Sequence, residues 1–167
     1  MTAVPSPVRE PAWPLSRSAI GLWVTEGVIG SVLLGIAAFL FVAFVPSNVP
    51  AALRWLVSAA AVAYAVVAIG VRPWVRFRVH RWEVTGDAVY TLTGWLTRTW
   101  TLVPISRIQT VDVTRGVLQQ MFGLASVAVL TASSQGTVRV PHLEVDVAHR
   151  VADDLAHRAE QVRDQAT

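Results

Sequence analysis

The chain contains no cysteine and no lysine, and all fourteen of its basic residues are arginine. Without cysteine, neither a disulfide nor a thiolate metal site can form. Without lysine, the chain lacks the residue that a Walker A loop places on nucleotide phosphates, and also the amine from which Schiff bases form. These two absences exclude several classes of enzyme.

Motifs of catalysis are also missing. The sequence has no nucleophile elbow, no glycine-rich phosphate loop and no paired-carboxylate motif. His149, Asp153 and His157 recur every four residues and could form a metal-binding face of a helix, but such a row is more often simply solvated. The sequence therefore predicts no catalytic residue, no metal ligand and no cofactor.

The charge of the chain is unevenly distributed. The net charge is +3. Residues 1–81 carry seven arginines and two acids, which gives a charge of +5. Residues 82–167 carry seven arginines and nine acids, which gives a charge of −2. The basic residues thus flank the apolar runs described next. This pattern gives little support to nucleic-acid binding, and we predict no nucleic-acid partner.

Two long apolar runs, residues 19–45 and 51–71, are separated only by residues 46–50. About 20 apolar residues match a bilayer core of about 30 Å, so each run predicts a transmembrane helix and the connection predicts a short external loop. The first run is too long for the apolar region of a signal peptide. Three tryptophans fall near the expected ends of the runs, where indole rings favour the membrane interface: Trp23, Trp55 and Trp74.

Arginines follow the second run closely. We define the arginine cluster as Arg72, Arg76, Arg78 and Arg81. The positive-inside rule then predicts that both termini are cytoplasmic. The proline-rich residues 1–18 are expected to form a mobile cytoplasmic tail. The cluster has two interpretations, since it can set topology alone or also bind anionic lipid headgroups.

Within the first run, one acidic residue and a row of small residues stand out. If it lay inside the membrane, Glu26 would serve a proton or ion path or pair with a partner helix. If residues 27–45 span alone, it would lie near the headgroups. Gly27, Ser31 and Gly35 recur every four residues, which places small side chains on one helix face. Such a face favours close helix packing, within the hairpin or between protomers.

The hydrophobic period changes after the second run. Val75, Phe77 and Val79 alternate with polar residues, which predicts a strand over residues 74–80, with Pro73 ending the helix. Further alternating segments predict strands, a short corner is expected at residues 118–122, and a hairpin turn at 133–136. The further strands are expected at residues 89–95, 98–103, 105–114, 124–132 and 137–140.

The C-terminal segment is different again, because apolar residues step by three or four from Val147 to Val162. This spacing predicts an amphipathic helix that covers a sheet. The expected fold is a two-helix transmembrane hairpin followed, over residues 72–163, by an α+β domain. That domain would have six or seven antiparallel strands and a C-terminal helix.

Several of these segments resemble a known family. Residues 104–109 read Pro-Ile-Ser-Arg-Ile-Gln, residues 118–124 read Leu-Gln-Gln-Met-Phe-Gly-Leu, and Thr131-Ala132 ends the next strand. With the hairpin and the C-terminal helix, residues 15–160 resemble the YdbS-like family of membrane-anchored bacterial pleckstrin-homology (PH)-like proteins. The resemblance implies a PH-like fold with a strongly bent antiparallel sheet, and no enzyme activity. Members often carry a basic residue where this chain has Gln120.

Exposed strand edges offer a possible docking site for a protein. Arg107, Gln109 and Arg115 are the candidate partner-binding residues, although the first two could equally be ordinary edge residues. The first hypothesis is a non-enzymatic scaffold that binds, at the cytoplasmic face, a second membrane protein with related PH-like domains or another copy of itself. The resemblance associates such a role with envelope homeostasis or export of toxic compounds. A sensor of anionic lipid headgroups and an accessory subunit of a transporter are the alternatives.

Overall fold

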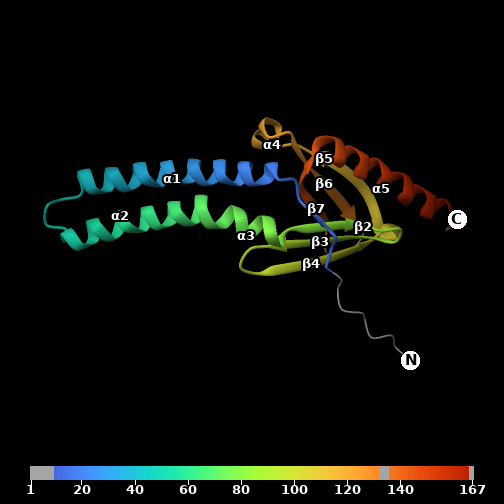
Figure 1. Ribbon diagram of the computed structural model, residues 1–167, viewed down its shortest axis with the longest axis horizontal. Helices are drawn as coiled ribbons and strands as arrows, with labels where there is room; N and C mark the ends of the chain where they lie inside the picture. The colour runs from blue at the N-terminus through green and yellow to red at the C-terminus, as the bar shows by residue number, and fades with distance from the viewer. Residues whose placement is uncertain (1–9, 132–135, 166–167) are drawn as a thin grey trace, which may run out of the picture. The chain divides into compact units, whose positions relative to one another are not determined.

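The computed structural model describes residues 10–131 and 136–165, and the chain divides into two compact units (Figure 1). One unit is the helical segment Ile20–Val75. The other is a domain assembled from the chain before and after that segment, Met1–Ala19 and Arg76–Thr167. The polypeptide thus leaves the domain to form the helices and then returns to complete it.

The helical unit contains two long helices, which confirms the predicted hairpin. The first, α1, is Ser18–Phe44, and the second runs over Ala51–Val79. Both are long and apolar enough to cross a membrane, since 27 and 29 residues at about 1.5 Å each exceed the bilayer core. The second helix consists of α2 (Ala51–Ala65), the π-helix η1 (Val66–Val71) and α3 (Arg72–Val79).

The prediction of a strand over residues 74–80 is wrong, because this segment is helical. The backbone N–H of His80 donates to the carbonyl oxygen of Arg76 at 2.8 Å, as in an α-helix. Pro73 does not end the helix either. The π-turn before it is wider than an α-turn, with Arg72 N donating to Val67 O, and so accommodates a residue that lacks an N–H group.

The expectation of a mobile N-terminal tail is wrong for residues 10–17, and residues 1–9 lie outside the described part of the chain. Trp13–Pro14 forms β1, which pairs with β2 (Arg81–Val84). The N–H of Ala12 donates to Glu83 Oε2 at 3.0 Å, and Leu15 is buried. This segment is therefore part of the domain.

The described strands form two antiparallel sheets. β1 and β2 continue with β3 (Ala88–Gly94) and β4 (Arg98–Pro104), in the order β1-β2-β3-β4. The second sheet has the order β5-β6-β7 and consists of β5 (Ile108–Thr114), β6 (Leu124–Thr131) and β7 (Thr137–Glu144). These seven strands agree with the predicted six or seven, but β1 and β2 were not among the expected segments and residues 74–80 form no strand.

The expected strand over residues 105–114 is shorter than predicted. It is preceded by a 3₁₀ turn, η2 (Ile105–Arg107), in which Ile105 is buried and its N–H donates to Asp87 O at 2.9 Å. The pairing of β5 with β6 also shifts register between Ile108 and Thr110. The bulge leaves Gln109 exposed, so the alternation predicted for this segment does not hold.

Two helices complete the domain. The short helix α4 (Val117–Met121) forms the predicted corner, and Gly123 follows it with φ +64°, a conformation that favours glycine. The C-terminal helix α5 (Val145–Gln165) packs on β5, β6 and β7 (Figure 1). Its buried face confirms the amphipathic prediction and consists of Ala148, Ala152, Leu155 and Ala159. Of the hairpin turn predicted at residues 133–136, residues 133–135 lie outside the described chain.

Candidate functional site

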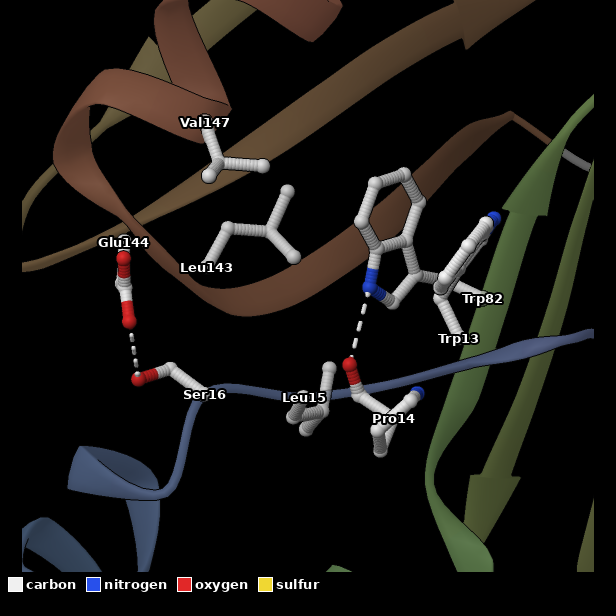
Figure 2. Close-up of a pocket in the computed structure, with 8 residues that line it drawn as sticks. All are labelled: Trp13, Pro14, Leu15, Ser16, Trp82, Leu143, Glu144 and Val147. Atoms are coloured by element: carbon white, nitrogen blue, oxygen red, sulfur yellow. Dashed lines mark hydrogen bonds between the residues drawn. The ribbon is translucent and has the colours of Figure 1, made fainter.

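An open, mostly apolar groove of about 420 Å³ lies on the domain (Figure 2). Three segments that are distant in sequence form its walls: the N-terminal segment around β1, strand β2, and the junction of β7 with α5. Its apolar lining includes Trp13, Leu15, Trp82, Leu143 and Val147. We call this the tryptophan groove.

Pairing of β1 with β2 builds one wall of the groove. Trp13 is the register partner of Trp82, and the indole Nε1 of Trp82 donates to the carbonyl oxygen of Pro14 at 3.2 Å. Trp13 is 59% exposed although it belongs to a strand. The domain therefore fixes the backbone beneath a large aromatic side chain that it does not bury.

The polar groups of the groove are already engaged. Ser16 Oγ donates to Glu144 Oε1 at 3.4 Å, and Trp82 Nε1 donates to the carbonyl oxygen of Pro14 (Figure 2). Enzyme sites instead present several convergent polar groups to a substrate. The free surface of the groove is thus suited to apolar or aromatic side chains of a ligand.

A second polar cluster lies around His142, which has φ +53°. Gln119 Nε2 is 2.7 Å from Ser126 Oγ and 3.1 Å from His142 Nδ1. Burial, with the charges of Arg76 and His80, lowers the pKa of His142 to about 4. This imidazole is neutral at physiological pH, and the cluster fixes the α4 corner against β6 and β7.

His80 closes the C-terminal end of α3. Its Nδ1 lies 2.8 Å from the carbonyl oxygen of Arg76, so Nδ1 carries the proton and donates. Burial is the largest cause of the lowered pKa of His80. The charged form is disfavoured here as well.

The arginine cluster is divided between two elements. Arg72, Arg76 and Arg78 lie on α3, whereas Arg81 begins β2. Arg72 and Arg78 are exposed, and the other two are half-buried. The cluster therefore does not form the polar face of one strand.

The small residues of α1 have different surroundings. A Cβ at Gly27 would lie 2.5 Å from the carbonyl oxygen of Ala68, whereas a Cβ at Gly35 would meet no atom within 4 Å. Ser31 Oγ donates to Gly27 O at 2.7 Å within its own helix. Gly30, outside the predicted row, would bring a Cβ within 2.9 Å of the Tyr64 hydroxyl. Close approach is thus concentrated at Gly27 and Gly30.

Other residues singled out in α1 and its partner helix are placed as follows. Glu26 has an exposed side chain on α1. Trp23 is buried, at 2% exposure, whereas Trp55 and Trp74 are exposed. The ring of Trp23 is therefore covered by protein, and the expectation of indole rings at the membrane interface stays a prediction.

The three candidate partner-binding residues belong to different local structures. Arg107 ends η2, Gln109 forms the bulge of β5, and Arg115 precedes α4. All three are exposed, and the Nε of Arg115 donates to Leu124 O at 3.2 Å. Among the described residues, no hydrogen bond or ion pair joins them.

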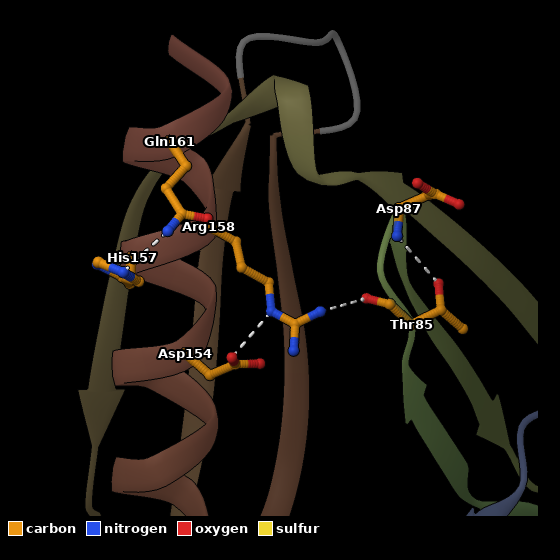
Figure 3. A network of polar contacts seen from close by, with 6 residues as sticks. All are labelled: Thr85, Asp87, Asp154, His157, Arg158 and Gln161. Atoms are coloured by element: carbon orange, nitrogen blue, oxygen red, sulfur yellow. Dashed lines mark hydrogen bonds and ion pairs between the residues drawn. The ribbon is translucent and has the colours of Figure 1, made fainter. Parts of the chain in front are cut away.

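The histidine row of α5 lies on the surface. His149, Asp153 and His157 are exposed, and His157 Nε2 lies 3.0 Å from Gln161 Nε2. On the same helix Arg158 pairs with Asp154 at 2.8 Å and donates to Thr85 O at 3.3 Å (Figure 3). In the part of the chain that the structure describes, no group of three His, Cys, Asp or Glu side chains could hold a metal ion.

The sequence interpretation missed the tryptophan groove. Its lining comes from segments that the chain brings together only on folding, and residues 1–18 lack the periodicity that would have marked Trp13 as a strand residue. The available signal was the pair Trp13 and Trp82, both outside the long apolar runs. Aromatic residues of this kind are enriched in binding surfaces.

Comparison with known proteins gives two matches. A family model described as "Bacterial PH domain" matches residues 20–159, which is most of the chain. The UPF0699 transmembrane protein YdbS of Bacillus subtilis (strain 168) is 32% identical over 94 residues, which cover 56% of this chain. The chain spans 58% of the length of that relative. No solved structure matches the chain.

Proposed function

The chain belongs to the bacterial PH domain family, as a YdbS-like membrane protein, and on this premise we propose that it is a non-enzymatic adaptor. Its transmembrane hairpin would hold the PH-like domain at the cytoplasmic face of the bacterial plasma membrane. There the domain would bind a protein partner. The family does not by itself define an activity, so the proposal depends on the geometry of the site.

The tryptophan groove is the observation that carries this proposal. Protein interfaces concentrate binding energy in a few aromatic anchors within apolar surroundings, and tryptophan is prominent among them. Here Trp13 is 59% exposed beside Trp82, while Ser16 and Glu144 are bonded to each other. An apolar or aromatic segment of a protein matches this surface better than a charged substrate does.

The proposed partner is a second membrane protein with related PH-like domains, and another copy of this chain is the alternative partner. Both would be held in the same membrane, so tethering would raise their effective concentration and a modest groove could suffice. The YdbS-like resemblance associates this arrangement with envelope homeostasis or with export of toxic compounds.

The distribution of arginine supports the proposed topology. Arg17 precedes α1 and the arginine cluster follows the second spanning segment, whereas residues 45–50 carry no charge. Arg54 lies just inside α2 and its Nη2 donates to the Pro46 carbonyl oxygen at 3.1 Å. By the positive-inside rule both termini are then cytoplasmic. A reporter that is active only in the cytoplasm should be active when it is fused after Thr167. A periplasmic location of this fusion would contradict the topology.

A sensor of anionic lipid headgroups is a second candidate, favoured by the exposed guanidinium groups of Arg72 and Arg78. The two functions make different predictions. Neutralising Arg76, Arg78 and Arg81 together should leave partner binding intact if the chain is an adaptor, provided that the chain still inserts. It should abolish the response to anionic lipid if the chain is a sensor.

Affinity purification from native membranes in mild detergent tests the adaptor proposal. Trp13→Ala should reduce recovery of a membrane protein with PH-like domains, because loss of an aromatic anchor costs about 2 kcal/mol or more, about thirtyfold in Kd. Trp100→Ala is the matched control, since Trp100 is also exposed but lies on β4 outside the groove. Equal recovery with both variants and the unaltered chain would refute the proposal.

A further inference from the structure

We infer that two apolar tips at one end of the PH-like domain insert into an anionic lipid surface. The first tip is the β3–β4 turn with Leu96, and the second is the α4 corner with Val117 and Met121. The apolar side chains of both tips are exposed, and neither tip belongs to the tryptophan groove. The inference does not depend on the adaptor proposal.

The end of the domain in question is defined by the first strand pair. Pro14, the last residue of β1, pairs with Arg81, the first residue of β2. The chain therefore leaves for the helical segment and returns from it at the same end of this strand pair. β2 begins just after α3, and β1 ends shortly before α1 begins at Ser18. The chain therefore passes to both spanning helices from one end of the domain, which we call the junction end.

The first tip projects from the junction end. Arg81, the first residue of β2, pairs with Leu92 of β3. Strand β3 extends two residues past Leu92, to Gly94, and the chain then turns into β4. Gly94 has φ +134°, and a Cβ there would collide with the carbonyl oxygen of Thr97, so only glycine fits this tight turn. At its apex Leu96 is 84% exposed.

The second tip lies at the same end. The N–H of Val145 donates to Gly123 O at 3.2 Å, directly after α4. The neighbouring Glu144 accepts the hydrogen bond from Ser16, two residues before α1 begins. The α4 corner is therefore adjacent to the segment that enters the first spanning helix.

The α4 corner presents its apolar residues outward. Gln119 holds the inner side, through Ser126 Oγ at 2.7 Å and through Gly116 N, which donates to Gln119 Oε1 at 3.0 Å. At 100° per residue, positions two before and two after Gln119 point to the opposite side. These are Val117 and Met121, which are 77% and 73% exposed.

Each tip has an exposed arginine beside it, Arg98 at the start of β4 and Arg115 before α4. The Nε of Arg115 donates to Leu124 O at 3.2 Å, which leaves the two terminal nitrogens of this exposed side chain for other acceptors. Guanidinium groups pair with phosphate, and apolar residues beside basic ones are typical of surfaces that enter the headgroup region. This combination fits an anionic lipid surface better than a protein groove.

Depth-dependent fluorescence quenching tests the inference on the full chain in lipid nanodiscs containing phosphatidylglycerol. Because the chain has no cysteine, one introduced cysteine gives a single site for the fluorophore NBD. The test variants are Leu96→Cys and Met121→Cys. The control is Gly86→Cys, in the β2–β3 turn at the opposite end of β2, where a Cβ would meet no atom within 4 Å.

Probes at positions 96 and 121 should show blue-shifted emission and strong quenching by lipids that carry a nitroxide near the headgroup. The probe at position 86 should show neither. Two outcomes would overturn the inference. One is equal quenching at all three positions. The other is a blue shift at 96 or 121 without quenching by nitroxide lipids, which would mean that protein covers the tip.

Discussion

The indole Nε1 of Trp82 donates a hydrogen bond of 3.2 Å to the carbonyl oxygen of Pro14. This bond, with the β1–β2 pairing, joins the segment before the first spanning helix to a strand that follows the second. The tryptophan groove therefore exists only when both flanks of the hairpin are folded together. Its shape therefore depends on the two-residue strand β1.

Removal of the Glu83 carboxylate should release residues 10–17. The N–H of Ala12 donates to Glu83 Oε2 at 3.0 Å, and Glu83 is buried, so Glu83→Ala leaves this donor without its acceptor. The cost is about 1–3 kcal/mol. Hydrogen exchange of Trp13 should become faster, whereas Glu83→Gln, which keeps an acceptor oxygen, should have a smaller effect. Unchanged exchange in Glu83→Ala would show that other contacts hold the segment.

Gly27→Ala should destabilise the helix pair. Its new methyl group would lie 2.5 Å from the carbonyl oxygen of Ala68, and overpacking of this kind costs about 1–3 kcal/mol. Gly35→Ala is the matched control, since a Cβ there meets no atom within 4 Å. The measurement is thermal unfolding of the purified chain in detergent. If both variants melt at the same temperature, the two helices do not approach each other closely at Gly27.

Acidification should destabilise the domain through His142. Folding lowers the pKa of this residue from 6.5 to about 4, so the unfolded chain binds the proton more readily. The stabilisation is fully present above pH 6.5 and is lost as the pH falls toward about 4. His142→Asn stays neutral and tolerates the residue's positive φ. Its melting temperature should therefore fall less than that of the unaltered chain between pH 7 and pH 4.5, and an equal fall would contradict the assignment.

Arg158 should contribute more to stability than its ion pair alone. Its Nη1 donates to Thr85 O at 3.3 Å and so ties α5 to the β2–β3 turn, while its Nε pairs with Asp154 (Figure 3). Arg158→Ala loses both contacts and should cost about 1–2 kcal/mol. Asp154→Ala loses only an exposed pair, worth less than about 1 kcal/mol. Chemical denaturation of the two variants checks this order, and equal losses would contradict it.

The parts of the fold that local periodicity determines were predictable. Long apolar runs predicted α1 and the second helix, and the spacing of three or four residues from Val147 onward predicted α5. Alternation failed at residues 74–80, because the spacing of Val75, Phe77 and Val79 is typical of a strand although the segment is helical. The second long helix, Ala51–Val79, continues through this segment.

The groove could not have been predicted from local patterns. Trp13 and Pro14 become a strand only because β2 offers a partner, and proline provides no strand signal by itself. Likewise, the bulge at Gln109 arises from the pairing of β5 with β6. Tertiary contacts decide these features, so the tryptophan groove is the part of the domain least visible in the sequence.

Photocrosslinking in native membranes tests the central claim most directly. A photoreactive phenylalanine analogue placed at Trp13, in the groove, should form a covalent product with a second PH-domain membrane protein or with another copy of the chain. The same analogue at the exposed Trp100, outside the groove, should form none. Absence of a product at position 13, or equal products at both positions, would contradict the claim that the tryptophan groove binds a protein partner.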